Sequence, residues 1–278
     1  MLHTQRRRRA SVLLALVSLV VALALGSAPA GAVTSLPVST STVTVSEAGR
    51  SFSARLVQQT GEARGAYPVV AFGHGFTQAT SCYQSVLAAL AARGYVVIAP
   101  NTETGLLPNH GRLADDLAIA IRWAQRTQPN AHPTLDAVSG HSMGGGAALL
   151  AADRNPSVDS VVTFAAAETR PSATTASPGI TVPAMFVVGS RDRIVTPETT
   201  KRMYAATPSP AIFATITGGY HCGFVDSSSF LGFGCDSGSI SRSTQLSITR
   251  TLLGDWLDRT LNGAAAVPVP EGVVTEVK

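Results

Sequence analysis

The sequence predicts an α/β fold in which a mostly parallel central sheet carries helices on both faces. Short segments that are apolar throughout, such as YPVVAFG and YVVIAP, alternate with longer amphipathic segments such as LADDLAIAIRWAQ. Strands that are buried on both faces read as continuous apolar runs, and helices connect parallel strands. Ligands bind at the carboxyl ends of such strands, so we look for chemistry just after each strand.

The elements follow one another along the chain, and we find no internal repeat or interdomain linker. Residues 33–41 should be a flexible start. The expected strands read VTVS, FSARLVQ, YPVVAFG, YVVIAP, LDAVSG, SVVTFAA, VPAMFVVGS and IFATIT. The expected helices cover residues 83–92, residues 113–125, a segment opening at Met143, residues 197–206 and residues 243–261. Residues 264–278 should form a loose tail, as chain ends often do.

The first 32 residues have the layout of a secretory signal peptide. Residues 6–9 are all arginine, residues 10–25 are uncharged and apolar, and small residues follow. The small-x-small pattern fits cleavage after Ala30 or after Ala32, and we favour Ala32. A stretch of this length is short for a bilayer span, for which about 20 apolar residues are needed. We therefore expect a secreted, extracellular protein with no stable membrane anchor and one domain over residues 33–278.

The basic character of the sequence lies in this leader. The whole chain has 21 Lys and Arg against 17 Asp and Glu, a net charge of +4. Residues 1–32 hold four of the basic residues and none of the acidic ones, so 17 of each sign remain. A near-neutral mature chain gives no reason to expect nucleic acid or an anionic membrane as a partner. We expect a monomer.

Three cysteines in an exported chain predict one disulfide and one remaining thiol. Cys222 and Cys235 are close in sequence and are the first pairing to consider. A bond from Cys82 to either of them is the alternative.

Ser142 is the candidate nucleophile. It lies in VSGHSMGGGAAL, directly after the expected strand LDAVSG and directly before a helix, which is the context of a G-x-S-x-G nucleophile elbow. The sharp turn strains the backbone of the serine, while Gly140 and Gly144 allow the strand and the helix to approach closely. An ordinary turn serine is the alternative, because short motifs recur by chance. A serine hydroxyl also needs a base.

His221 is the expected general base. It lies in TGGYHCGF, after the last expected strand and before the last helix, where a loop can reach the elbow.

The other five histidines are not expected to serve as the base. His74, in FGHGF, should shape the oxyanion loop, and the turn should point the ring of His141 away from the nucleophile. His110 and His132 should lie in loops with no strand end beside them, and His3 leaves with the leader.

Asp192 is the expected third member of the triad, which orients the imidazole and stabilises its charged form. It closes the strand in VPAMFVVGSRD, ahead of the helix at residue 197. A turn or helix-entry aspartate is the alternative role. Glu168 is the rival acid, and Asp226 is too close to His221 in sequence. The order Ser142, Asp192, His221 is the order found in α/β hydrolases.

Two backbone N–H groups are expected to form the oxyanion hole. Met143 supplies the first, because it opens the helix after the nucleophile and the helix dipole favours negative charge there. Phe76, in GHGFT after an earlier strand, supplies the second. The ring of Phe76 would then line the acyl pocket, unless it only packs within its loop.

Four segments, GHSMGGG, GSRDRIVTP, GGYHC and HGFTQATSCYQSVLAALAARGYVVIAPNT, together resemble the secreted cutinase-like polyester hydrolases of bacteria, with dienelactone-hydrolase-like esterases as wider relatives. The resemblance covers roughly residues 67–262. Carried over residue by residue, it implies Ser142, Asp192 and His221 as the triad and Phe76 and Met143 as the oxyanion pair.

The chain departs from that family in three ways. The polyester hydrolases carry a substrate-clamping tryptophan soon after the strand that here ends FAAAETR, whereas Trp123 and Trp256 fall within expected helices and should be core residues. The loop HCGFVDSSSFLGFGC also differs after the histidine. A dienelactone hydrolase proper would have cysteine at position 142.

These observations predict a secreted serine carboxylic ester hydrolase that acts through an acyl-enzyme on short to medium acyl esters. Cutin or synthetic polyesters such as PET are further substrates that the resemblance implies. A triacylglycerol lipase, a peptidase or an acyltransferase are alternatives, because the triad does not fix the acceptor. A non-catalytic binding protein of the same fold is a further alternative, although such proteins usually lose a triad member. We expect no cofactor and no metal, since no ligand cluster, phosphate loop or dinucleotide fingerprint occurs.

Overall fold

The described part of the chain alternates strands with helices. The computed structural model describes residues 37–60, 66–208, 210–227 and 235–278, so the expected leader over residues 1–32 lies outside it. The strands are β1 (Val38–Glu47), β2 (Arg50–Gln59), β3 (Tyr67–Gly73), β4 (Val96–Pro100), β5 (Ala131–His141), β6 (Ser160–Phe164), β7 (Ala184–Gly189), β8 (Ala211–Ile216) and β9 (Val273–Val277). The helices are α1 (Gln84–Ala92), α2 (His110–Thr127), α3 (Met143–Arg154), α4 (Ala173–Ala176), α5 (Pro197–Ala206) and α6 (Arg242–Leu261), with short 3-10 turns η1 (Thr80–Tyr83), η2 (Ser177–Gly179) and η3 (His221–Phe224).

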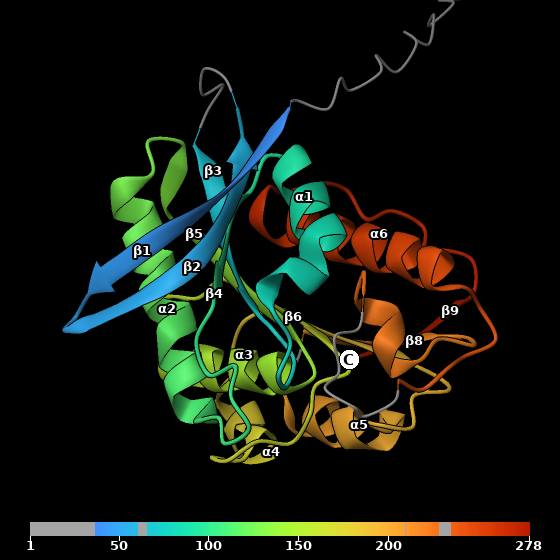
Figure 1. The fold of residues 1–278 in the computed structure, drawn as a ribbon. Helices are drawn as coiled ribbons and strands as arrows, with labels where there is room; N and C mark the ends of the chain where they lie inside the picture. Colours follow the sequence, from blue (N-terminus) through green and yellow to red (C-terminus); the bar gives the residue numbers. More distant parts are fainter. Residues whose placement is uncertain (1–36, 61–65, 209, 228–234) are drawn as a thin grey trace, which may run out of the picture. The chain divides into compact units, whose positions relative to one another are not determined.

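The described strands join in one sheet with the order β1-β2-β4-β3-β5-β6-β7-β8-β9 (Figure 1). Every neighbouring pair from β4 to β8 is parallel, while β1, β2 and β9 add antiparallel pairs on the two sides. This arrangement is the α/β-hydrolase fold, as the sequence predicts.

Helices cover both faces of the sheet, and the strands alternate between two cores. Val69 and Ala71 of β3 pack in the core that α2, α3 and α5 complete. Val70 and Phe72 of the same strand pack in the core that α1 and α6 complete. Successive side chains of a strand point to opposite faces, so a continuous apolar run serves two layers of helices.

Side-chain caps set two helix starts slightly earlier than the apolar pattern predicts. The Asn109 side chain accepts a hydrogen bond from the backbone N–H of Arg112 at 2.9 Å, and α2 therefore begins at His110. Ser241 caps α6 through the N–H of Thr244 at 3.0 Å, so this helix begins at Arg242.

The expectation of a loose tail over residues 264–278 is wrong at its end. Residues 273–277 form β9, which pairs antiparallel with β8 from Val273 beside Ile216 to Val277 beside Ile212. The alternation VVTEV suits an edge strand that is half exposed, and the prediction overlooked this because the segment follows a stretch rich in Ala and Pro. The expected position of His132 in a loop is also wrong, since it lies in β5.

The connection between β6 and β7, over residues 165–183, is short and holds only α4 and η2. This is the position in which lipases of the fold insert a helical lid. None of the helices in the described ranges combines the length and the apolarity needed to span a bilayer.

Candidate active site

Ser142 lies on a strained turn between β5 and α3. Its φ of 55° and ψ of −120° fall in a region that residues with a side chain rarely adopt. Hydrogen bonds from the N–H of Ser142 to the carbonyl of Phe164, and from the N–H of Ala167 to the carbonyl of Ser142, hold this conformation at 2.9 Å each. The backbone geometry is that of a nucleophile elbow.

Three glycines let the elbow close. A Cβ on Gly144 would lie 2.1 Å from the carbonyl oxygen of Gly73, and a Cβ on Gly140 would lie 2.4 Å from that of Gly144. No side chain fits at these distances, so α3 can approach β3 and β5 only because these positions are glycine. The sequence predicts this role for Gly140 and Gly144, while that of Gly73 was overlooked.

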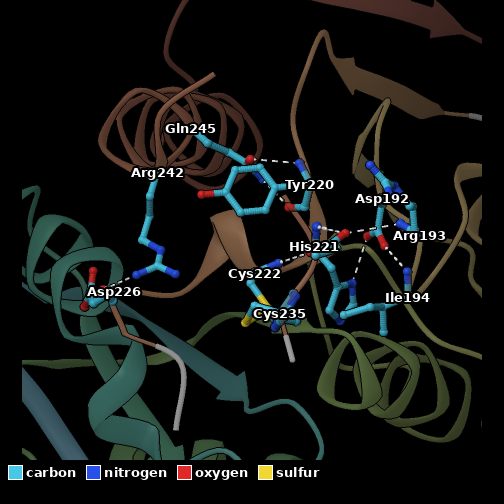
Figure 2. The surroundings of a disulfide bond; sticks show 12 residues. Asp192, Arg193, Ile194, Tyr220, His221, Cys222, Asp226, Cys235, Arg242 and Gln245 are labelled. Carbon is cyan, nitrogen blue, oxygen red and sulfur yellow. Dashed lines mark hydrogen bonds and ion pairs between the residues drawn. A yellow bond between two sulfur atoms is a disulfide. The ribbon is translucent and has the colours of Figure 1, made fainter. Parts of the chain in front are cut away.

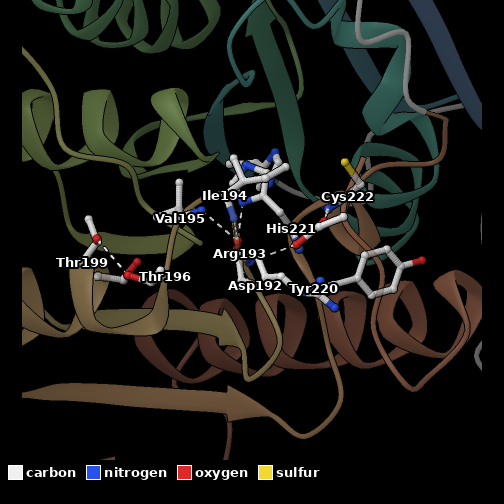
Figure 3. A network of polar contacts seen from close by, with 12 residues as sticks. Asp192, Arg193, Ile194, Val195, Thr196, Thr199, Tyr220, His221 and Cys222 are labelled. Carbon is white, nitrogen blue, oxygen red and sulfur yellow. Dashed lines mark hydrogen bonds and ion pairs between the residues drawn. The ribbon is translucent and has the colours of Figure 1, made fainter. Parts of the chain in front are cut away.

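Asp192 and His221 form a buried pair. The Oδ2 atom of Asp192 lies 2.8 Å from Nδ1 of His221, and its Oδ1 accepts the backbone N–H groups of Ile194 and Val195 at 2.9 and 2.8 Å. Figure 3 shows this carboxylate between the turn after β7 and the imidazole. Asp192 is therefore a turn aspartate and the partner of His221 at once, because each oxygen serves one role.

Ser142 and His221 line one cavity of about 280 Å³ at the carboxyl ends of the strands. Both residues expected to form the oxyanion hole, Phe76 and Met143, line it too. Ala167, Ile194, Val195 and Val225 add apolar side chains to the wall. Another cavity, of about 110 Å³ between β8, α6 and the chain before β9, contains none of the predicted site residues.

His74 and Tyr83 support the loop that carries Phe76. The ring nitrogens of His74 lie 2.9 Å from the carbonyl oxygen of Gly75 and 2.7 Å from that of Thr102. The hydroxyl of Tyr83 accepts the N–H of Gly75 at 2.8 Å. His74 thus contacts the expected oxyanion loop and ties it to the chain after β4.

His141 does not turn away from the site, contrary to expectation. It lines the cavity, and its ring centroid lies 4.5 Å from that of His221. Burial, reinforced by the neighbouring His221, holds the pKa of His141 well below its ordinary value. The Tyr83 hydroxyl lies 3.0 Å from Nδ1 of His141 and can donate to it. A neutral His141 avoids a second positive charge beside His221 when that imidazole is protonated.

Glu168, the rival acid, has a different role. Its Oε1 accepts the N–H groups of Thr169 and Ala173 at 3.1 and 2.8 Å, and its Oε2 accepts the Thr174 hydroxyl. Burial opposes ionisation of Glu168, but the hydrogen bonds from Thr174 and its neighbours outweigh it and lower the pKa. Glu168 lines the cavity while its carboxylate bonds the start of α4, and the carboxylate bonded to His221 is that of Asp192.

Sequence reasoning missed two polar residues of the cavity wall. His110 opens α2 and lines the cavity, and its Nδ1 accepts the N–H of Arg170 at 2.9 Å. Gln78 also lines the cavity and is 3% exposed; within the described chain its Oε1 has no hydrogen-bond partner. The helix-capping residue Asn109 is the sequence signal that would have placed His110 at the start of a helix, and therefore at the carboxyl edge of the sheet.

Cys222 and Cys235 are joined by a disulfide, the first of the two pairings considered. Cys82 is buried and lies outside this bond. Trp256 is 6% exposed and donates to Ser160 Oγ at 3.0 Å, while Trp123 packs half-buried against the core. Both tryptophans therefore have core roles, as predicted. Across the described ranges, no group of three His, Cys, Asp or Glu side chains could hold a metal ion.

Two comparisons with known proteins agree on one family. The family model of the chlorophyllases matches residues 31–169, half of the 278 residues. Chlorophyllase-1 of Arabidopsis thaliana is 36% identical over 111 residues, which are 37% of this chain and 34% of that protein. The chain thus matches about a third of the relative's length. The family match contains Ser142 but ends before Asp192 and His221, so for these two residues the evidence is their hydrogen bond in the structure.

Proposed function

This chain belongs to the chlorophyllase family, a family of α/β-hydrolase-type esterases, and we propose that it is a secreted serine carboxylic ester hydrolase. One observation carries the proposal. The strained serine of the elbow and an imidazole held by a buried carboxylate line the same cavity. Backbone strain at a polar residue and a buried acid paired with a histidine are features that cluster at active sites.

The first half of the reaction forms an acyl-enzyme. Asp192 occupies Nδ1 of His221, so Nε2 remains to take the proton of the Ser142 hydroxyl as the oxygen attacks the ester carbonyl. Negative charge develops on the carbonyl oxygen, and the backbone N–H groups of Met143 and Phe76 stabilise it. When the tetrahedral intermediate collapses, the bond to the alkoxy group breaks and His221 returns the proton to the departing alcohol.

Water then completes the cycle. His221 takes a proton from the water that attacks the acyl carbonyl, and it returns this proton to Ser142 as the carboxylic acid leaves. The low pKa of His141 keeps the neighbouring ring neutral while His221 is charged. The reaction consumes one ester and one water and requires no cofactor.

The cavity favours short to medium acyl esters. Its volume of about 280 Å³ lies just below the usual range of small-molecule sites, and its wall is mainly apolar. The connection over residues 165–183 holds no helix long enough to act as a lid, so we expect the mouth to admit the end of a polymer chain such as cutin or PET. The described wall has no tryptophan to clamp such a chain, so polyester activity should be weak. The name of the relative adds chlorophyll as a substrate to test.

Secretion is part of the proposal and is supported by the leader-like first 32 residues and by the Cys222–Cys235 bond. The substrate is tested on p-nitrophenyl esters of increasing acyl length, beside chlorophyll a, tributyrin and a PET film. We expect the highest kcat/KM on the short to medium p-nitrophenyl esters. A rate on all of these that equals the rate of a Ser142→Ala variant would contradict the proposal.

A further inference from the structure

Asp236 joins the loop of the predicted acid to the loop of the predicted base. Its Oδ2 accepts the backbone N–H of His221 at 3.0 Å and that of Arg193 at 3.1 Å, while its Oδ1 accepts the N–H of Cys222 at 3.1 Å. Arg193 directly follows Asp192. The Asp236 carboxylate therefore bonds the backbone of the loop that carries Asp192 and the backbone of the loop that carries His221.

The disulfide fixes where this carboxylate lies. Asp236 follows Cys235, and Cys235 is bonded to Cys222, the residue after His221 (Figure 2). The disulfide and two of the three hydrogen bonds thus join residues 235 and 236 to residues 221 and 222, and the third hydrogen bond joins Asp236 to Arg193. Hydrogen bonds to an ionised group are about twice as strong as neutral ones, so the carboxylate holds its three backbone N–H partners firmly in place.

Other contacts hold the residues of this loop that precede His221. Gln245 of α6 accepts the N–H of Tyr220 at 3.0 Å and donates to its carbonyl at 2.8 Å (Figure 2). A hydrogen bond from the backbone N–H of Arg191 to the carbonyl of Gly219, 2.8 Å long, joins the turns that follow β7 and β8. These contacts fix the loop up to residue 220, whereas Asp236 acts on His221 itself.

We propose that Asp236 is a positioning residue of the ester hydrolase reaction, which sets the placement of His221 relative to Asp192 without touching the substrate. The inference rests on the proposed function. A misplacement of about 1 Å can cost about a hundredfold in rate, because proton transfer needs close alignment of donor and acceptor. Substrate binding does not depend on this alignment, so a misplaced His221 should lower kcat and leave KM nearly unchanged.

The test compares Asp236→Asn with Asp226→Asn, a matched control. Asp226 lies in the same loop, but its carboxylate bonds the backbone and the hydroxyl of Ser85 at the start of α1. The Asp236→Asn substitution keeps one oxygen but presents an NH₂ group to at least one backbone N–H. We measure kcat and KM on p-nitrophenyl butyrate, normalised to the fraction of protein that a fluorophosphonate titrates.

We expect kcat of Asp236→Asn to fall by about ten- to a hundredfold with KM within about twofold of wild type, while Asp226→Asn keeps its kcat. An unchanged kcat at position 236, or an equal loss at position 226, would overturn the inference. If Asp236→Asn yields no titratable protein, Asp236→Glu decides: it keeps the charge but moves it by one methylene, so a wild-type kcat would overturn the inference. A wild-type enzyme without esterase activity would instead refute the proposed function.

Discussion

The Oδ2 atom of Asp192 lies 2.8 Å from Nδ1 of His221, and the two side chains are 0% and 3% exposed. The second carboxylate oxygen is occupied by two backbone N–H groups, so the carboxylate cannot rotate away without losing them. This arrangement fixes the imidazole tautomer that leaves Nε2 free to accept a proton.

Replacing Asp192 by Asn should therefore lower kcat by about 10⁴, because the wrong tautomer of His221 would be held. Glu168→Gln should be mild, since that carboxylate bonds the start of α4 and not the histidine. Steady-state kinetics of both variants on one p-nitrophenyl ester make the comparison. The reverse ranking would transfer the acid role to Glu168.

The short connection between β6 and β7 predicts the absence of interfacial activation. Over residues 165–183 it holds one short helix and one 3-10 turn, and neither is long enough to act as a helical lid that a lipid interface would open. The rate on tributyrin should rise smoothly and saturate through the solubility limit. A sharp increase at that limit would favour a true triacylglycerol lipase.

The Cys222–Cys235 bond should stabilise the fold through the chain that it closes. The two residues are 13 apart in sequence, and a loop of this size is expected to contribute about 3 kcal/mol to the free energy of unfolding. Mass mapping of peptides without reduction should find this pair linked and Cys82 outside it. A linked Cys82, or three thiols that all react with an alkylating agent, would refute the pairing.

The stability of the fold should depend on Asp136 at the start of the buried part of β5. Burial, together with the nearby carboxylate of Asp159, raises the pKa of Asp136 to about 7. The unfolded chain loses this proton near pH 4, so between about pH 4 and pH 7 the folded state binds one proton more. The free energy of unfolding should therefore fall as pH rises through this window.

An Asp136→Asn variant removes this titrating carboxyl group. The free energy of unfolding of the variant minus that of wild type should therefore increase by on the order of 2 kcal/mol from pH 5 to pH 8. Urea unfolding at the two pH values measures the change. A difference between variant and wild type that stays constant with pH would contradict the raised pKa.

The apolar runs were sufficient to predict the strands from β1 to β8 and the longer helices, but not α4. Each buried strand contributes side chains to two cores and therefore reads as a continuous apolar run, as in β3. Gly140 and Gly144 were also predictable, because a strand-serine-helix junction requires them, whereas Gly73 lies in another strand. The half-exposed strand β9 was not predicted, since five alternating residues at a chain end give a weak signal.

Contacts between distant loops could not be read from the sequence. His110 lines the cavity at the start of α2, and its ring accepts the N–H of Arg170 from the chain between β6 and β7. Asp236 lies 15 residues beyond His221 and gains its role only through the disulfide and the turn after β7. The placement of such residues depends on tertiary packing, which the pattern of residue types along the sequence does not reveal.

If Ser142 is the nucleophile, it forms a covalent bond with a reagent that traps activated serines. The purified protein is incubated with a fluorophosphonate, digested and analysed by mass spectrometry, and the same treatment is applied to a Ser142→Ala variant with an unchanged circular dichroism spectrum. We expect one adduct per chain on the peptide that contains Ser142, no adduct in the variant, and a loss of ester hydrolysis of several orders of magnitude in the variant. An unmodified Ser142, or a variant that keeps more than about a tenth of the wild-type rate, would contradict this role of Ser142.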